Sequence, residues 1–149
     1  MQPTLSHLKT WARQAGDLLR RGQKTSFKIE HKGRVDLVTE MDKLSEDYLL
    51  GQIRQHFPHH AIVSEESGNF EGSSDCDCTW FVDPLDGTVN YAHGVPIYVV
   101  SIGYGEHGRM KLGVIYDPTR NEMFSAEAGK GAWLNNRRIR VSGQTELLQ

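Results

Sequence analysis

The first sixty residues carry apolar side chains at helical spacing in two stretches. Leucine and alanine recur every three or four residues between Leu5 and Leu19, which predicts an amphipathic helix with one buried face. Thr4 is placed to cap the start of this helix, and the cations and glycine of residues 20–22 are typical of a helix end.

A second helix is predicted to follow a short strand that ends near Thr39. Thr39 and Asp42 have the spacing of a capping box. Pro58 ends the helix because proline cannot continue its hydrogen bonding. The apolar face of this helix is expected to contain Leu44, Tyr48, Ile53 and Phe57.

Beyond Phe57, short apolar runs replace the helical spacing. Residues 61–64 and 79–83 are interpreted as buried strands, and residues 68–78 between them as a surface loop. From Pro96 onward the pattern predicts strands within residues 97–105, 111–118, 121–129 and 131–142. Two helices followed by an antiparallel meander indicate an α+β fold, in which both amino-terminal helices pack on one face of a mostly antiparallel sheet.

Composition and charge narrow the class of protein. The chain has 149 residues and a net charge of −2, which suits one domain or part of a larger one. Because there is no basic excess, we expect neither nucleic acid nor a membrane surface as a partner. The basic cluster at residues 135–140 is interpreted as the solvated face of a strand or turn. No apolar run approaches the ~20 residues of a spanning helix, and the first residues lack the features of a signal peptide, so the expected location is the cytoplasm.

The two cysteines, Cys76 and Cys78, are separated by one residue. A bridge between residues that close would be strained, and two thiols without a second pair of ligands do not make a zinc site. We therefore expect both cysteines to be reduced and exposed in the loop.

Acidic residues stand beside predicted strand ends and a helix start at three places. These residues are Asp42, Glu65, Glu66, Asp83 and Asp86. If the fold gathers them, they repel each other unless a cation holds them. Oxygen ligands without histidine or cysteine favour magnesium, calcium or manganese. The pattern therefore predicts a site for a hard divalent cation.

The segment around Pro84 suits such a site. Pro84 fixes its own φ, so that Asp83 and Asp86 can point toward one volume with the Leu85 carbonyl between them. Gly87 allows close backbone approach, and Thr88 can open a short helical turn whose free N–H groups receive a phosphate. A bound metal lowers the pKa of water, and Thr88 with Asp42 could accept the water's proton.

Each of these features also has a structural explanation when taken alone. Asp-Pro-x-Asp-Gly is a common turn composition, Asp42 fits a helix cap, and paired glutamates are common on surfaces. Their joint occurrence, each beside the predicted end of an element, favours the metal site.

Other motifs are interpreted as structural. Residues 103–108 match G-x-G-x-x-G, but a strand-like segment follows them, so we expect a hairpin turn. Asp117 also predicts a hairpin. The histidines within residues 56–60 have no evident fourth metal ligand. His93 follows the phosphate turn, and a substrate contact and a packed or surface position both stay open for it.

Three segments together resemble the signatures of the inositol monophosphatase family. They are residues 36–42 (DLVTEMD), 64–67 (SEES) and 80–91 (WFVDPLDGTVNY). The resemblance extends into residues 137–142 and covers nearly the whole chain. It implies a layered sugar-phosphatase fold and a magnesium-dependent, lithium-sensitive phosphatase that hydrolyses a phosphate monoester of inositol or a related sugar. The family is often dimeric, so the resemblance leaves a homodimer open without fixing the oligomeric state.

The resemblance assigns roles residue by residue. The implied Mg²⁺ ligands are Glu65, Asp83, the carbonyl of Leu85, and Asp86. The implied substrate-binding residues are Glu65, Leu85, Asp86, Gly87 and Thr88, of which the last two resemble the phosphate-binding pair. Thr88 and Asp42 resemble the catalytic pair that activates the attacking water.

The chain departs from the family in length. Family members are considerably longer, and their second half supplies another metal-binding aspartate in a Trp-Asp motif. Here no tryptophan is followed by aspartate. Residues 1–149 are therefore expected to be the amino-terminal metal- and phosphate-binding part of such a domain, with the carboxy-terminal half missing. The alternative is a non-catalytic metal- or phosphate-binding or interaction fragment that lacks half of the active site.

Overall fold

The computed structural model describes residues 2–23, 29–32 and 36–145, with the backbone alone described at 29–32 and 36–39. Its helices are α1 (Leu5–Gly22), α2 (Glu40–His56) and the short α3 (Thr88–Ala92). Its strands are β1 (Ile29–Lys32), β2 (Asp36–Thr39), β3 (Ala61–Ser64), β4 (Gly68–Phe70), β5 (Cys78–Asp86), β6 (Val99–Glu106), β7 (Arg109–Asp117), β8 (Glu122–Glu127), β9 (Gly131–Leu134) and β10 (Arg137–Ile139).

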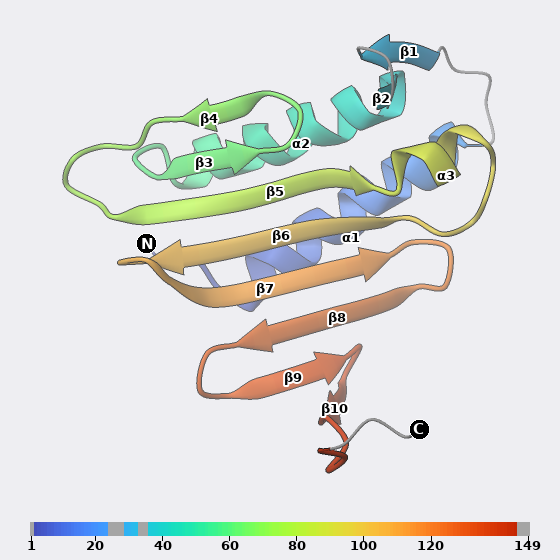
Figure 1. Ribbon diagram of the computed structural model, residues 1–149. Helices are drawn as coiled ribbons and strands as arrows, with labels where there is room; N and C mark the ends of the chain where they lie inside the picture. The colour runs from blue at the N-terminus through green and yellow to red at the C-terminus, as the bar shows by residue number, and fades with distance from the viewer. Residues whose placement is uncertain (1, 24–28, 33–35, 146–149) are drawn as a thin grey trace.

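Eight strands form one sheet in the order β10-β9-β8-β7-β6-β5-β3-β4. All neighbours in this sheet are antiparallel except β3 and β5, which run parallel. From β5 to β10 each strand pairs with the next, which confirms the predicted meander. The two hairpins predicted around residues 103–108 and at Asp117 are the β6–β7 and β7–β8 turns. A separate hairpin of β1 and β2 lies beside α3 (Figure 1).

Both long helices cover the same face of the large sheet, which confirms the α+β prediction (Figure 1). Helix α1 packs on β6, β7 and β8, and α2 packs on β5 and against α1. Thr4 caps α1 as predicted, and its backbone N–H donates to His7 Nδ1 (3.2 Å). None of the helices in the described part of the chain is long and apolar enough to cross a membrane.

The apolar face of α2 differs from the prediction. Leu44 is 52% exposed and Tyr48 is half-buried. The inward face runs through Met41, Asp42, Ser45, Glu46, Leu49, Leu50 and Ile53. The helix is turned so that three polar side chains of its first turns point inward, and a pattern of apolar residues alone cannot reveal that orientation. The capping role predicted for the Thr39 side chain lies outside the described residues.

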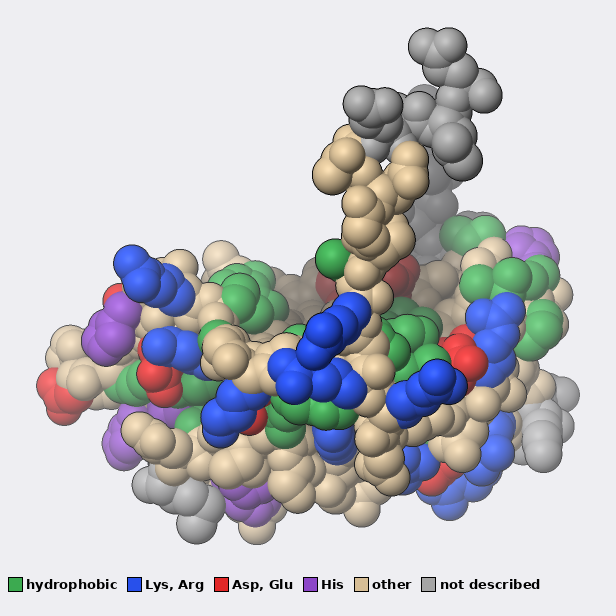
Figure 2. Space-filling view, turned by 90° about the horizontal axis from the view of Figure 1, so that it is seen from below, with side chains coloured by type: hydrophobic (Ala, Val, Ile, Leu, Met, Phe, Trp, Pro, Cys, Tyr) green, Lys and Arg blue, Asp and Glu red, His purple; other side chains and the backbone are tan. Residues whose placement is uncertain are grey.

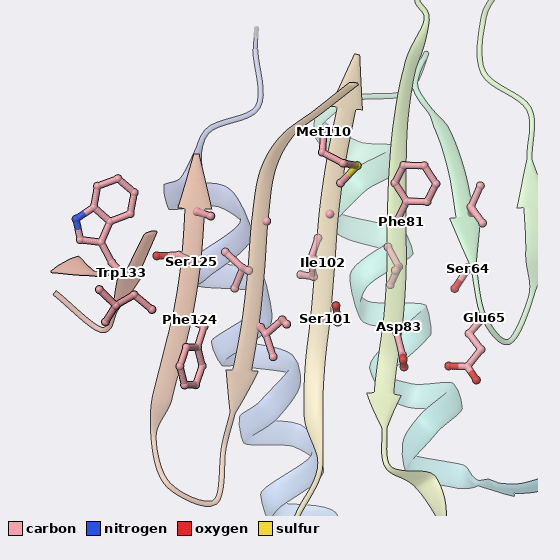
Figure 3. A pocket seen from close by; sticks show the side chains of 18 residues that line it. Ser64, Glu65, Phe81, Asp83, Ser101, Ile102, Met110, Phe124, Ser125 and Trp133 are labelled. Atoms are coloured by element: carbon pink, nitrogen blue, oxygen red, sulfur yellow. The ribbon is translucent and has the colours of Figure 1, made fainter. Parts of the chain in front are cut away.

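The opposite face of the sheet is uncovered in the part of the chain that the structure describes, and it is apolar. Side chains alternate along β5, so that Trp80 and Val82 are buried under the helices while Phe81 is 43% exposed. Small residues of β6 and β7, with larger ones around them, line a hollow of about 630 Å³ on this face (Figure 3). Glu65 and Asp83 close one end of the hollow.

Two predictions for residues 68–78 are wrong. Gly68–Phe70 forms β4 and pairs with β3 at the edge of the sheet. The local sequence does not show that the edge of β3 is free to accept this strand. Cys76 and Cys78 form a disulfide, with Cα atoms 5.2 Å apart, and both are half-buried. The chain turns just before them, where Cys76 N donates to Ser73 O (3.2 Å), and this turn brings the two side chains together.

The carboxy-terminal strands form a hairpin, β9–β10, with exposed basic side chains on β10, as predicted for the cluster at residues 135–140. Figure 2 shows Lys and Arg side chains spread over this side of the molecule, with hydrophobic and polar atoms between them. Residues 140–145, which follow β10, project away from the rest, and Val141 is 96% exposed (Figure 2).

Candidate functional site

The parallel pair β3 and β5 brings the first two candidate acids together. Ser64 pairs with Val82 in this ladder, and Glu65 N donates to Val82 O (3.1 Å) just beyond it. The next residue of β5 is Asp83, so the two carboxylates leave neighbouring strands at the same level. Figure 3 shows both side chains at the same end of the hollow.

The turn after Asp83 is fixed from two sides. Asp83 Oδ1 accepts a hydrogen bond from Leu85 N (3.2 Å), and the pairing of β5 with β6 shifts register between Asp83 and Asp86. From the helix layer, the buried Ser45 hydroxyl donates to Pro84 O (2.9 Å). Asp86 is exposed beyond this irregularity.

Thr88 connects the turn to α2. Its Oγ1 lies 2.9 Å from Leu85 O and 3.3 Å from Asp42 Oδ2, and the single hydroxyl proton can be donated to either. Asp42 is 1% exposed. Gly87 precedes α3 with φ of 96°, and a Cβ there would lie 2.9 Å from Ile97 O. Glycine is therefore required at the step that leads into Thr88.

The electrostatics of the site show that the acids share one region. The pKa of Asp42 is raised to about 7, first by burial and then by the charge of Glu66, against a hydrogen bond from Thr88 that lowers it. The charges of Asp83 and Glu65 add to the rise. Burial likewise raises the pKa of Asp83 to about 7, together with the charge of Glu65, a hydrogen bond between the two carboxyls and the charge of Asp86.

Glu46 is the residue of this site that sequence reasoning missed. It is buried and accepts hydrogen bonds from Ser64 Oγ (2.5 Å), Ser67 N (2.9 Å) and Ser67 Oγ (2.5 Å). These contacts hold the segment that carries Glu65. The available signal was Ser64, whose hydroxyl needs an acceptor because it lies on a buried strand.

One turn of α2 thus reaches two separate segments of the site. Asp42 and Ser45 contact residues 84–88, which run from the irregular end of β5 to the start of α3, and Glu46 contacts residues 64–67 at the end of β3 and just after it. Residues three and four apart lie on one helix face, so this single face aligns both segments.

The donor set fits a hard divalent cation. Burial and the charges of the nearby carboxylates raise the pKa of Asp83. A cation that enters between these carboxylates stabilises their charged forms, and Mg²⁺ and Ca²⁺ prefer oxygen ligands. In the described residues these acids do not yet place three ligand oxygens within 4.8 Å of one another. Rotation of the exposed Glu65 and Asp86 side chains is therefore needed to close the site. His93 is exposed and is not hydrogen-bonded to the candidate site residues in the described contacts.

Helices on one face of a mostly antiparallel sheet, with an acidic oxygen-donor site where its two parallel strands end, define a layered α+β domain with a candidate site for a hard divalent cation. Residues 1–149 match the inositol monophosphatase family along their whole length. The chain belongs to this family.

Sequence relatives agree with the family match. Inositol monophosphatase 3 of Solanum lycopersicum is 45% identical over 142 residues, which are 93% of this chain and 52% of that protein. The Nus factor SuhB of Escherichia coli K12 is 42% identical over 149 residues, which are 99% of this chain and 55% of that protein. The chain therefore spans about half the length of these relatives.

Solved structures share the fold. The extragenic suppressor protein suhB of Bartonella henselae aligns with a TM-score of 0.88 at 35% identity, over 93% of this chain and 54% of that one. The inositol monophosphatase of Anabaena (Nostoc) sp. PCC 7120 aligns with a TM-score of 0.79 at 42% identity, over 95% and 50%. These matches confirm two helices on a mostly antiparallel sheet as the fold of this half.

Proposed function

We propose that the chain is the metal- and phosphate-binding half of a magnesium-dependent phosphatase that hydrolyses a phosphate monoester of inositol or a related sugar. The observation that carries the proposal is the convergence of Glu65 and Asp83 at the ends of the parallel strands, next to the Thr88–Asp42 contact. Family membership supplies the reaction class, and the name of the tomato relative supplies the substrate class.

The residues that would hold Mg²⁺ are Glu65, Asp83, Asp86 and the carbonyl of Leu85. When bound, the ion supplies positive charge that lowers the pKa of water and offsets the charge of the phosphate. Asp83 is held in place by its bond from Leu85 N. The exposed Asp86 side chain can rotate toward the ion, and the exposed Glu65 side chain can do so when the ion replaces its hydrogen bond to Asp83.

Asp42 and Thr88 are proposed to handle the proton of the attacking water. The Thr88 hydroxyl can take a proton from water while it gives its own to Asp42 Oδ2, 3.3 Å away. Burial raises the pKa of the Asp42 carboxyl to about 7, which makes it a better proton acceptor than an ordinary aspartate. Mg²⁺ held by the neighbouring carboxylates would offset the part of this shift that their charges cause.

Substrate binding is proposed at Glu65, Leu85, Asp86, Gly87 and Thr88. Gly87 and Thr88 would receive the phosphate, because their backbone N–H groups stand at the start of α3. Gly87 has to be glycine because a Cβ there would lie 2.9 Å from Ile97 O. No side chain at position 87 can therefore obstruct the phosphate.

Two measurements on the 149-residue chain test the proposal. We expect calorimetry to show Mg²⁺ uptake, and a phosphate-release assay with inositol monophosphate and fructose bisphosphate to show turnover that requires Mg²⁺ and is inhibited by Li⁺. If the chain does not take up Mg²⁺, the proposed metal site is wrong, whatever the phosphate-release assay shows.

A second candidate is a non-catalytic metal- and phosphate-binding or interaction fragment. Its support is that the chain spans about half of its relatives, one of which is named as a Nus factor and not for an enzymatic activity. Mg²⁺ uptake without phosphate release from any of the esters would favour this candidate.

Glu46→Gln tests how the Glu65 segment is positioned. The substitution removes the charge that accepts bonds from Ser64 and Ser67. We expect Mg²⁺ affinity to fall by about 10-fold, as is usual when the partner of a ligand-bearing group is lost. The control is Glu71→Gln, the same change at an exposed position. Equal Mg²⁺ affinity in the two variants, measured by calorimetry, would contradict the role given to Glu46.

A further inference from the structure

A second group of potential ligands lies at the other end of β5. Cys78 is the first residue of that strand, whereas Asp83 and Asp86 are near its end. Sulfur atoms of Cys76 and Cys78 and a ring nitrogen of His60 all lie within 4.8 Å of one another. All three residues are half-buried. The two groups are therefore separate in place and in chemistry, since one offers oxygen and the other sulfur and nitrogen.

The backbone holds His60 against the cysteine segment. Ser73 N donates to His59 O (2.8 Å), which ties the segment before the cysteines to the residue next to His60. A Cβ on Gly72 would lie 2.6 Å from Ala61 N, so this approach depends on glycine. On the other side, His107 N donates to Asp77 O (2.9 Å). The residue between the cysteines is thus fixed to the β6–β7 turn.

The His60 ring is also held in place. It stacks on Phe57 (centroids 5.1 Å apart) and on Tyr104 (5.7 Å). Trp80 Nε1 donates to His60 Nδ1 (3.1 Å), so the neutral ring carries its proton on Nε2. Burial lowers the pKa of His60, which favours the neutral form that can bind a metal.

We propose that Cys76, Cys78 and His60 form a redox-gated site for a thiophilic metal ion such as Zn²⁺. The disulfide is the closed state, because its sulfurs cannot act as thiolates. A dithiol reductant opens the site: the Cys76–Cys78 bond breaks, two electrons pass to the two sulfurs, and the reductant leaves as its own disulfide. The two protons end on the cysteines and are released when the thiolates bind the metal.

Two thiolates and one imidazole are typical zinc ligands, and a water molecule can complete the tetrahedron. Binding at His60 has one structural consequence. If the metal takes Nε2, the ring proton moves to Nδ1, and Nδ1 can no longer accept from Trp80. If the metal takes Nδ1, it replaces Trp80 directly. Either route breaks the Trp80–His60 hydrogen bond, so metal binding should change the environment of the indole.

The experiment titrates Co²⁺, as a spectroscopic substitute for zinc, into the 149-residue chain in excess Mg²⁺. One sample is reduced with dithiothreitol, which is then removed under argon, and the other is left oxidised. We expect the reduced chain to show thiolate-to-cobalt charge-transfer absorption that saturates at one ion per chain, together with a change in tryptophan emission. We expect neither signal from the oxidised chain. Added Zn²⁺ should displace the cobalt and remove the absorption.

Matched variants test the role of each ligand. His60→Gln should weaken Co²⁺ binding by at least about 10-fold, and His59→Gln, next to it and exposed, should leave it unchanged. Cys76→Ser and Cys78→Ser should each lose most of the charge-transfer absorption, with circular dichroism confirming that each variant is folded. Absence of that absorption in the reduced wild-type chain would overturn the proposal, and so would equal affinity of the two histidine variants. Neither result bears on the magnesium site, because carboxylates give no thiolate band.

Discussion

Asp83→Asn is expected to lower the affinity for Mg²⁺ by more than about 100-fold. Loss of a residue that only hydrogen-bonds to a metal ligand typically costs about 10–100-fold, and Asp83 is proposed to be a ligand itself. Asp83 lies at the centre of the acid group, since its pKa responds to both Glu65 and Asp86. An amide in its place keeps the shape of the side chain but supplies no charge. Calorimetric titration with Mg²⁺ measures the effect, and unchanged affinity would remove the basis of the metal site.

The same substitution should have the opposite effect on the metal-free chain. Because the pKa of Asp83 is raised to about 7 in the folded state, the folded chain holds this proton more tightly than the unfolded chain. The contribution of Asp83 to stability therefore decreases as the pH rises from about 4 to about 7, and it is unfavourable above that.

Asp83→Asn removes this penalty. We expect a higher melting temperature than wild type at pH 8 without metal, little difference at pH 4, and no further rise with Mg²⁺, whereas Mg²⁺ should stabilise the wild type. Asp47→Asn, the same change at an exposed position of α2, serves as the control and should retain the response to Mg²⁺.

Trp80→Ala is expected to lower the free energy of unfolding by about 3–5 kcal/mol. Trp80 is 0% exposed, and its ring lies between those of Tyr104 (4.9 Å), Phe57 (5.4 Å) and Trp11 (5.7 Å). Removing it leaves a cavity at the junction of α1, α2 and the sheet, which the surrounding rings can fill only in part.

The next residue provides a matched control. Phe81 lies on the same strand but on the uncovered face, so Phe81→Ala should cost less than about 1 kcal/mol in the isolated chain, as exposed substitutions usually do. Urea unfolding of the two variants measures the difference. Similar losses would mean that the two faces of the sheet are packed alike, contrary to the structure.

The elements of the fold were predictable wherever one local pattern decides them. Both long helices, the meander from β6 onward and the short helix after Gly87 follow from spacing, glycine and proline. The failures concern relations between distant segments. Leu44 was expected to be buried because apolar spacing cannot show that Asp42, Ser45 and Glu46 turn inward. β4 was missed because its pairing edge belongs to β3.

For the site, the candidate acids were identified because carboxylates beside element ends are conspicuous in the sequence. The roles of these acids stay predictions. The proximity of Glu65 to Asp83 depends on the parallel pairing of β3 with β5, and the alternation of side chains along each strand does not reveal which strands pair. Glu46 was missed since a buried glutamate is recognised only with its partners. His60 and the cysteines were considered separately because the fifteen residues between His60 and Cys76 hide a contact made by backbone turns.

The single helix face formed by Asp42, Ser45 and Glu46 makes α2 a shared support for two distant parts of the chain, residues 64–67 and 84–88. We therefore expect a disturbance of either part to affect the other through α2. An ion held by the carboxylates would slow amide hydrogen exchange along the buried side of α2, several turns from the nearest ligand, and loosening that helix would weaken ion, phosphate and proton handling together.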